Sequence, residues 1–188
     1  VTKERTNKVS FTHPQFDSYQ VLVQRKPENW RQLTRDQINA QLIRKPAQLI
    51  GKEIYVMPGS SFAQRLKHLS EEVGGEIIIN QDSTNAETEN LIRAVAMGEI
   101  EYTVTDNIIA RVNAAYYNNL DVETIISLPQ TIAWAVRKNS PGLEGAVNEW
   151  LAMVKKEPTF MVIFNRYFNS PRTSIIRLTS DYSSLAEI

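Results

Sequence analysis

The sequence predicts an α/β fold, and two observations support this prediction. Between Gly51 and Tyr116, three short apolar segments are each followed by a turn and an amphipathic helix. Strands that alternate with helices of this length are typical of a parallel sheet covered on both faces. The chain has 188 residues, of which 42% are hydrophobic, and this suffices for one or two domains with a packed core.

The first elements precede these repeats. Residues 19–25 are β-prone and are followed by Pro27, so we expect a strand that stops there. Thr34 then stands at the start of a short helix, where a hydroxyl is a favoured N-cap. The apolar residues of this helix recur at helical spacing before Pro46: Ile38, Leu42 and Ile43.

Each of the three repeats joins one strand to one helix. We expect the strands at residues 53–57, 76–79 and 102–105. Gly74 and Gly98 follow the first and second helices, as is typical of C-terminal caps, and Asp106 is placed to cap the third. The apolar faces of the helices consist of Phe62, Leu66, Leu69 and Val73; of Leu91, Ile92, Val95 and Ala96; and of Ile108, Ile109, Val112 and Tyr116.

The pattern changes after the third repeat. We expect strands at residues 122–126 and 131–136, interrupted at Pro129, with the apolar Trp134 in the core. Pro141 opens a long helix, and Pro158 separates it from a last helix over residues 160–168. The long helix carries Leu143, Val147, Trp150, Leu151 and Val154, and the Ser/Thr-rich residues 169–188 are predicted to be a connector or strap.

Composition argues for binding rather than chemistry. Lys+Arg and Asp+Glu both total 21, so no basic field favours nucleic acid, and no apolar run approaches the roughly 20 residues that span a bilayer. Without cysteine, disulfides, zinc-thiolate sites and thiol nucleophiles are excluded. His13 and His68 lie far apart, and the glycines form no phosphate-binding loop. We therefore expect no catalytic residues, metal or cofactor in this chain.

Four segments, taken in order, resemble one known family. Residues 2–5 read Thr-Lys-Glu-Arg, and residues 9–14 read Val-Ser-Phe-Thr-His-Pro. Residues 49–56 read Leu-Ile-Gly-Lys-Glu-Ile-Tyr-Val, and residues 98–106 read Gly-Glu-Ile-Glu-Tyr-Thr-Val-Thr-Asp. This ordered set resembles the bacterial extracellular solute-binding proteins of family 3, which are two-lobed modules that close around amino acids and related small molecules. The sequences of residues 102–106, 134–138 and 165–168 are most similar to those of the binding domain of the lytic murein transglycosylase F group.

The resemblance implies a type II periplasmic-binding-protein-like module with two lobes. Residues 20–127 would form a complete second lobe, and residues 1–14 with 133–168 part of a first lobe that lacks its opening strands. Residues 15–19 and 128–132 would be the hinge connections between them. Helices of such an incomplete lobe would expose apolar surface, so we also expect self-association through residues 160–168.

The resemblance also implies a function. We expect a non-catalytic sensor or regulatory domain that binds a small peptide, muropeptide or amino-acid-like ligand between the lobes. The partner would be a covalently linked lysozyme-like catalytic domain, whose motifs this sequence does not contain. The location would be the periplasm, with attachment to the outer membrane through the parent protein. The alternative is an amino-acid-binding receptor of an ABC transporter.

The same resemblance supplies the candidate site. Arg5 would hold a ligand carboxylate, because a guanidinium donates two parallel hydrogen bonds, although a solvated surface arginine is the alternative. Asp106 would meet the ligand's amino group, or simply cap its helix, and Thr105 is a weaker neighbour. Gly59, Ser60 and Ser61 form a turn before a helix, where backbone N–H groups suit an anion or serve ordinary capping. Phe16 and Tyr19 are expected to pack near the first hinge connection rather than to stack on a ligand.

Overall fold

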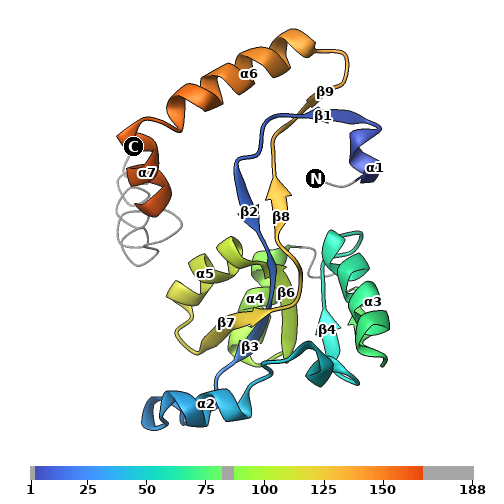
Figure 1. Cartoon of the computed structure of the whole chain (residues 1–188). Helices are drawn as coiled ribbons and strands as arrows, with labels where there is room; N and C mark the ends of the chain where they lie inside the picture. Colours follow the sequence, from blue (N-terminus) through green and yellow to red (C-terminus); the bar gives the residue numbers. More distant parts are fainter. Residues whose placement is uncertain (1–2, 82–86, 167–188) are drawn as a thin grey trace, which may run out of the picture. The chain divides into compact units, whose positions relative to one another are not determined.

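The computed structural model describes residues 3–81 and 87–166, and its contacts divide the chain into two compact units. Unit 1 comprises Val1–Ser18 and Pro129–Ile188, and unit 2 comprises Tyr19–Leu128. Each unit has its own strands and helices (Figure 1). None of the described helices is long and apolar enough to cross a membrane.

Unit 2 is built on a five-stranded mixed sheet. Its order is β5 (Ile78–Asn80), β4 (Glu53–Tyr55), β6 (Tyr102–Asp106), β3 (Gln20–Arg25) and β7 (Leu120–Ile125). Strand β4 is parallel to β5 and β6, whereas β3 is antiparallel to both β6 and β7. The prediction of a parallel sheet therefore holds for the three repeats, and β3, for which no direction was predicted, joins them antiparallel. Strand β3 precedes the repeats, so no crossover helix fixes its direction.

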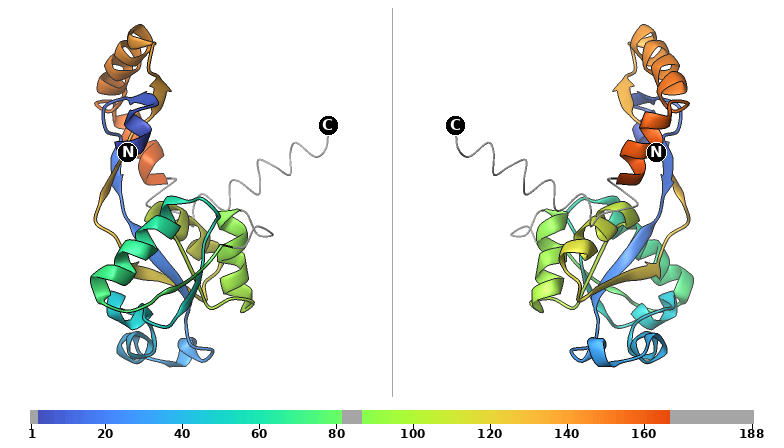
Figure 2. Two further views of the ribbon diagram at one scale, coloured as in Figure 1. Left: turned by 90° about the vertical axis from the view of Figure 1, so that its right-hand side faces the viewer. Right: turned by 90° about the vertical axis from the view of Figure 1, so that its left-hand side faces the viewer.

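Helices cover both faces of this sheet, as predicted (Figure 2). Along β3, Leu22 belongs to one apolar cluster, and Val21 and Val23 belong to the other, because successive side chains of a strand point to opposite faces. The Leu22 cluster is closed by α3 (Ser61–Val73). The cluster of Val21 and Val23 is closed by α4 (Thr88–Met97) and α5 (Asn107–Tyr116).

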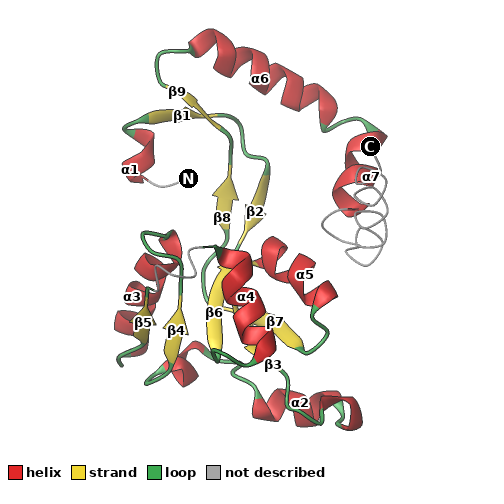
Figure 3. Ribbon diagram, turned by 180° about the vertical axis from the view of Figure 1, so that it is seen from behind, coloured by secondary structure: helices red, strands yellow, loops and turns green. Residues whose placement is uncertain are grey.

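The predicted helix caps are confirmed where their chemistry is local. Thr34 begins α2 (Arg35–Gln41) with a capping box, in which its hydroxyl accepts from the Gln37 N–H and the Gln37 side chain accepts from the Thr34 N–H. Gly74 and Gly98 end α3 and α4 with φ of 69° and 87°, in the left-handed region that glycine adopts without strain. Short 3₁₀ helices at Trp30–Gln32 and Pro46–Leu49 flank α2 (Figure 3).

A buried polar network ties the α2 region to the sheet. Asp121, on β7, accepts two hydrogen bonds from the Arg44 guanidinium at 2.6 and 2.8 Å and one from the Gln24 amide at 3.2 Å. Gln24 also donates to the Ile43 carbonyl at 2.9 Å and accepts from the Ile43 N–H at 3.0 Å. The hydrogen bond to Asp121 raises the pKa of Arg44, so this guanidinium stays charged. Every buried partner in the network is thereby satisfied.

Unit 1 is assembled from both ends of the chain. Strand β1 (Val9–Phe11) pairs antiparallel with β9 (Ala135–Arg137), and β2 (Phe16–Ser18) pairs antiparallel with β8 (Gln130–Ile132). The helices of this unit are α1 (Lys3–Thr6), α6 (Pro141–Val154) and α7 (Pro158–Phe164). The last helix was predicted to reach residue 168, and residues 167–188 lie outside the described part of the chain.

Trp134 corrects one prediction about unit 1. The strand predicted at residues 131–136 is two strands, and Trp134 lies between them with half of its surface exposed. Its backbone N–H donates to the Thr12 hydroxyl, and its ring stacks on Trp150 with 5.9 Å between the centroids. Trp134 is therefore a surface aromatic and not a core residue. The break follows because β8 and β9 have different partners, β2 and β1.

Candidate functional site

One end of the unit 2 sheet gathers the predicted site residues. Strands β4 and β6 finish at this end, and the antiparallel β3 begins there. The turn with Gly59 and Ser60 leads from β4 into α3, and Asp106 leads from β6 into α5. In α/β folds, the carboxyl ends of parallel strands are where ligands bind. Five of the six predicted residues lie here: Gly59, Ser60, Ser61, Thr105 and Asp106.

Three buried side-chain oxygens at this end have no hydrogen-bond partner. They are Gln20 Oε1, Ser60 Oγ and Thr105 Oγ1, and no other buried side-chain polar atom of residues 3–81 and 87–166 shares this property. Thr105 and Gln20 expose 0% and 1% of their surface. An unsatisfied buried polar group costs roughly 1–3 kcal/mol, so such groups are rare outside functional sites. A ligand with matching donors and acceptors would remove this cost.

The strand register shows which of these groups face each other. Gln20 lies opposite Asp106, and Val21 lies opposite Thr105. Directly opposed residues share a face, so Gln20 and Asp106 lie on the face that α3 covers, whereas Thr105 lies on the face that α4 and α5 cover. The N-cap position of α3 is Ser60. Polar groups thus approach the end of the sheet from both faces.

Asp106 occupies the predicted N-cap position of α5, but its side chain makes no capping hydrogen bond. The reading of Asp106 as an ordinary side-chain cap is therefore wrong, although the residue does hold the N-cap position. The Asn107 N–H, at the first helical position, donates to the Tyr19 carbonyl at 2.9 Å.

The turn before α3 offers fewer backbone donors than its sequence suggests. Gly59 adopts a φ of 67°, and its N–H donates to Gln81 Oε1 at 3.2 Å. The Ser60 N–H donates to the Met57 carbonyl, also at 3.2 Å. The N–H groups that remain for an anion are those of the first turn of α3, beginning at Ser61.

Arg5 belongs to unit 1, whereas the other five predicted site residues belong to unit 2. It is an exposed residue of α1 in unit 1, and its carbonyl accepts from the Lys8 N–H at 2.9 Å. The pairing of Arg5 with Asp106 across a bound ligand remains a prediction.

Gln20 is a site residue that was not predicted from the sequence. It stands at the start of an apolar strand in which Gln24 is the other glutamine, and both are buried. Two polar residues on one face of an apolar strand could have indicated a site, because buried polar side chains need hydrogen-bond partners. Gln24 finds them in the Asp121 network, whereas Gln20 Oε1 does not.

The aromatic residues near β2 pack, as expected. Phe16 lies 5.9 Å from Phe164 between ring centroids, within unit 1. Tyr19, at the start of unit 2, packs against the cluster of Val21 and Val23, and its hydroxyl accepts from Arg111. In the described residues, no group of three His, Asp or Glu side chains is placed to hold a metal ion.

A family model covers most of this chain. The bacterial extracellular solute-binding proteins of family 3 match residues 1–170. The chain belongs to this family. Its predicted family is therefore confirmed, and its arrangement of strands and helices is that of a family 3 solute-binding domain.

Curated relatives of this family 3 domain are larger proteins. The membrane-bound lytic murein transglycosylase F of Desulfosudis oleivorans is 30% identical over 173 residues, which make up 92% of this chain and 35% of that protein. The protein of the same name from Methylobacillus flagellatus is 28% identical over 170 residues, 89% of this chain and 33% of its own length. The chain thus spans about a third of these relatives.

Solved structures confirm the predicted fold class. An ancestral arginine-binding protein bound to arginine matches with a TM-score of 0.67 and 23% identity, over 89% of this chain and 68% of that one. The GluR0 ligand-binding core from Nostoc punctiforme, in complex with L-glutamate, matches with a TM-score of 0.68 and 19% identity, over 89% and 69%. These are type II periplasmic-binding-protein folds, and at such identities they establish the fold alone.

Proposed function

We propose that this chain is the non-catalytic ligand-binding domain of a lytic murein transglycosylase F-like protein, and that it binds a peptidoglycan-derived peptide or an amino-acid-like ligand. The observation that carries the proposal is the group of three unpartnered, buried oxygens of Gln20, Ser60 and Thr105 at one end of the unit 2 sheet. The transglycosylase names of the curated relatives support the peptidoglycan origin of the ligand.

The chemistry of this end suits a small zwitterionic ligand. The hydroxyls of Ser60 and Thr105 can each donate or accept, and Gln20 Oε1 accepts. Asp106, whose carboxylate does not cap α5, would meet an ammonium group, and N–H groups of the first α3 turn would meet a carboxylate. Arg5 is proposed as the second carboxylate partner. A stem-peptide terminus carries both charged groups.

In the whole protein, ligand binding would bias a covalently attached lysozyme-like catalytic domain. The chain itself would cleave no glycan, and it would work in the periplasm, attached through the parent protein to the outer membrane. Incubation of the chain with purified murein is expected to release no anhydro-muropeptides, and their release would overturn the non-catalytic assignment.

Thr105→Val tests the binding site itself. Valine keeps the volume of threonine and removes a hydroxyl that has no partner, so stability is expected to be unchanged or slightly raised. Calorimetry with a muropeptide that has free carboxylate and amine groups is expected to show at least tenfold weaker binding. The matched control is Thr103→Val on the same strand, which loses a 2.7 Å hydrogen bond to the Tyr55 carbonyl. That variant should lose stability and keep its affinity.

Arg5→Met and Asp106→Asn test the two charged contacts. Arg5→Met would leave the ligand carboxylate buried without its charged partner. This costs roughly 3–5 kcal/mol of binding free energy, enough to abolish detectable binding of a micromolar ligand. Asp106→Asn should weaken the binding of ligands that carry a free amine and leave the binding of their N-acetylated forms unchanged. Arg137→Met, an exposed arginine of β9, is the control. If Arg5→Met binds as tightly as the parent chain, Arg5 is not part of the site.

The second candidate function is an amino-acid receptor of an ABC transporter. It is favoured by the solved structures, which include arginine-binding proteins and a protein of glutathione import. The two candidates differ in the whole protein: a lysozyme-like segment downstream of Ile188 in the reading frame supports the sensor. A receptor would instead bind a free amino acid at least as tightly as a muropeptide.

A further inference from the structure

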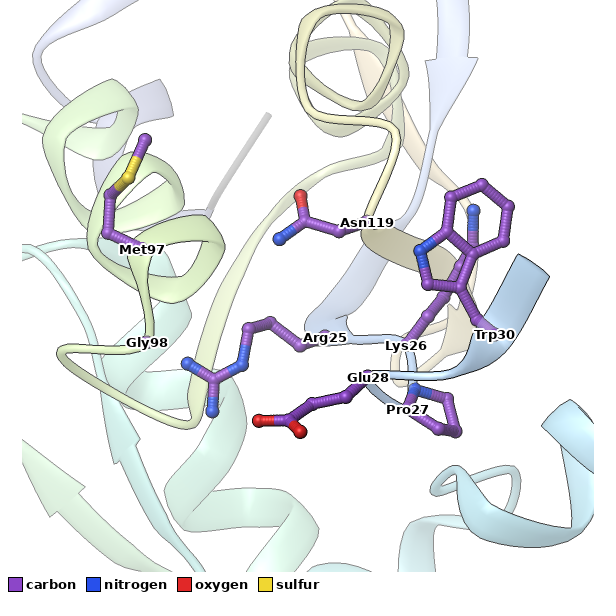
Figure 4. A pocket seen from close by; sticks show the side chains of 8 residues that line it. All are labelled: Arg25, Lys26, Pro27, Glu28, Trp30, Met97, Gly98 and Asn119. Atoms are coloured by element: carbon purple, nitrogen blue, oxygen red, sulfur yellow. The ribbon is translucent and has the colours of Figure 1, made fainter. Parts of the chain in front are cut away.

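Unit 2 has a cavity at the end of its sheet opposite to the candidate site. The cavity has a volume of about 650 Å³, within the range of small-molecule sites. Arg25, the last residue of β3, lines it, whereas Gln20, the first residue of β3, belongs to the candidate site. Five residue steps of strand separate the two by roughly 16 Å. The cavity, whose lining residues are drawn in Figure 4, is therefore distinct from the candidate site.

Arg25 brings unused hydrogen-bond donors to this cavity. One nitrogen, Nη1, donates to the Val95 carbonyl in the last turn of α4 at 3.3 Å. Within residues 3–81 and 87–166, Arg25 makes no other hydrogen bond and no ion pair. A guanidinium has five N–H donors, so most of this fork remains available for a bidentate carboxylate.

Gly98 makes room for that guanidinium. A Cβ atom at this position would lie 2.5 Å from Arg25 Nη1. The absence of a side chain, together with the φ of 87°, lets the end of α4 and the guanidinium come together. Asn119 fixes the neighbouring wall, because its amide donates to the Ala96 carbonyl at 2.8 Å.

Glu28 supplies an opposite charge that forms no ion pair with Arg25. Both side chains extend into the cavity in Figure 4. In the described part of the chain, the Glu28 carboxylate forms no ion pair and accepts no hydrogen bond. The other cation of the cavity, Lys26, is already engaged: it donates to the Asn118 carbonyl at 2.8 Å and lies 4.6 Å from the centre of the Trp30 ring. The free groups are thus one guanidinium and one carboxylate.

We propose that this cavity is a second ligand site, which takes a carboxylate on Arg25 and a hydrogen-bond donor of the same molecule on Glu28. The ligand class is a small carboxylic acid with a nearby amine or hydroxyl. A phosphate dianion fits less well, because it would meet the negative charge of Glu28 without offering it a donor. Amino acids and acidic sugars share the required chemistry, and the indole of Trp30 lines the wall beside it.

Nuclear magnetic resonance of the ¹⁵N-labelled chain tests this proposal with three probes. L-Alanine offers a carboxylate and an amine, D-glucuronate offers a carboxylate and hydroxyls, and propionate offers a carboxylate alone. L-Alanine or D-glucuronate is expected to shift the Gly98 amide, the Asn119 side-chain amide and the Trp30 indole N–H. Propionate should bind at least several-fold more weakly, and the stronger of the first two identifies the source of the ligand.

Three variants separate this site from its surroundings. Arg25→Met should weaken binding about tenfold or more, the expected loss for a hydrogen-bonded charge. Arg31→Met removes the same charge from a guanidinium that lies over the Trp30 ring but does not line the cavity, and it should leave binding unchanged. Glu28→Gln removes a charge that makes no hydrogen bond or ion pair within the described residues, so the stability of the fold should not change. It should reduce the affinity for L-alanine to that for propionate.

These experiments test the second site independently of the candidate site at the other end of the sheet. Asp106→Asn should change none of the shifts at Gly98, Asn119 and Trp30. Absence of these shifts for all three probes at 20 mM, or an equal loss in Arg25→Met and Arg31→Met, would overturn the second site. Failure of the Thr105→Val test would instead concern the proposed function alone.

Discussion

Units 1 and 2 both contain helices with large apolar side chains, but only unit 2 buries most of them. In unit 2, α3 buries Phe62, Ala63, Leu66 and Leu69, and α4 buries Leu91, Ile92, Ala94, Val95 and Ala96. Among the described residues of unit 1, Leu151 is the only buried hydrophobic residue. The exposed large hydrophobics of α6 and α7 are Leu143, Trp150, Met153, Met161, Val162 and Ile163.

The difference shows what helical periodicity encodes. The spacing of apolar residues determines which side chains share a face, and it does so most sharply for α3 and α4 of unit 2. Whether that face becomes a core depends on a second surface that the spacing does not contain. In unit 2 the five-stranded sheet supplies this surface. Unit 1 has only two two-stranded sheets among its described residues, and these offer less surface to cover a helix.

The largest expected effect comes from truncating a leucine in each unit. Leu66→Ala removes a fully buried side chain of α3 and should lower the free energy of unfolding by about 2–5 kcal/mol. Leu143→Ala removes a leucine of α6 that is 54% exposed and should change it by less than about 0.5 kcal/mol. Urea unfolding followed by circular dichroism measures both. Equal losses in the two variants would show that α3 and α6 are buried to the same extent.

Disrupting the polar network of unit 2 should have the second-largest effect on stability. Asp121→Ala leaves the Arg44 guanidinium and the Gln24 amide short of an acceptor, and we expect a loss of about 2–3 kcal/mol in the same urea assay. Part of the Arg44 side chain is exposed, which moderates the cost. The control is Glu123→Gln on the same strand, where the carboxylate is 59% exposed and its ion pairs are long, at 3.6 and 3.9 Å. That variant should lose less than about 0.5 kcal/mol.

The elements of unit 2 could be predicted from sequence because their signals are local. Thr34, Gly74 and Gly98 mark helix ends through hydrogen bonds and backbone angles within one turn of the chain. The direction of β3 could not be predicted in the same way, because it depends on pairing with β6 and β7, about 80 to 100 residues away. Sequence spacing carries no record of such partners.

The candidate site was only partly accessible for the same reason. The resemblance to family 3 indicated Ser60, Thr105 and Asp106, which the structure places at one end of the unit 2 sheet. Gln20 joins them through its register opposite Asp106. The exposure of Trp134 had no sequence signal either, since an apolar residue within one predicted strand is expected in the core. In each case, the missing information was the identity of a distant neighbour.

Self-association through unit 1 should show a smaller effect. The exposed face of α7 is expected to pair with a second copy through residues 160–168, because apolar patches of this kind favour association. Val162 is 65% exposed, and Val162→Lys should weaken dimerisation about tenfold, the equivalent of one buried side chain. Ile78→Lys on β5 of unit 2 is the control and should leave it unchanged. Sedimentation equilibrium measures both, and a strictly monomeric parent chain at high concentration would contradict the prediction.

The smallest expected effect is that of a surface ion pair on unit 2. The Arg65 guanidinium donates to both carboxylate oxygens of Glu72, at 2.6 and 2.9 Å, and this hydrogen bonding lowers the pKa of Glu72 below its ordinary value of 4.5. A lowered native pKa stabilises the fold above the unfolded pKa, and this contribution disappears as the pH falls through the native value. The melting temperatures of the parent chain and Glu72→Gln should therefore differ slightly near neutral pH and converge below about pH 4. Glu71→Gln, at an exposed neighbour on the same helix, should show no such convergence. A difference that persists at about pH 2, or one that does not shrink in high salt, would mean that Glu72 acts through packing instead of charge.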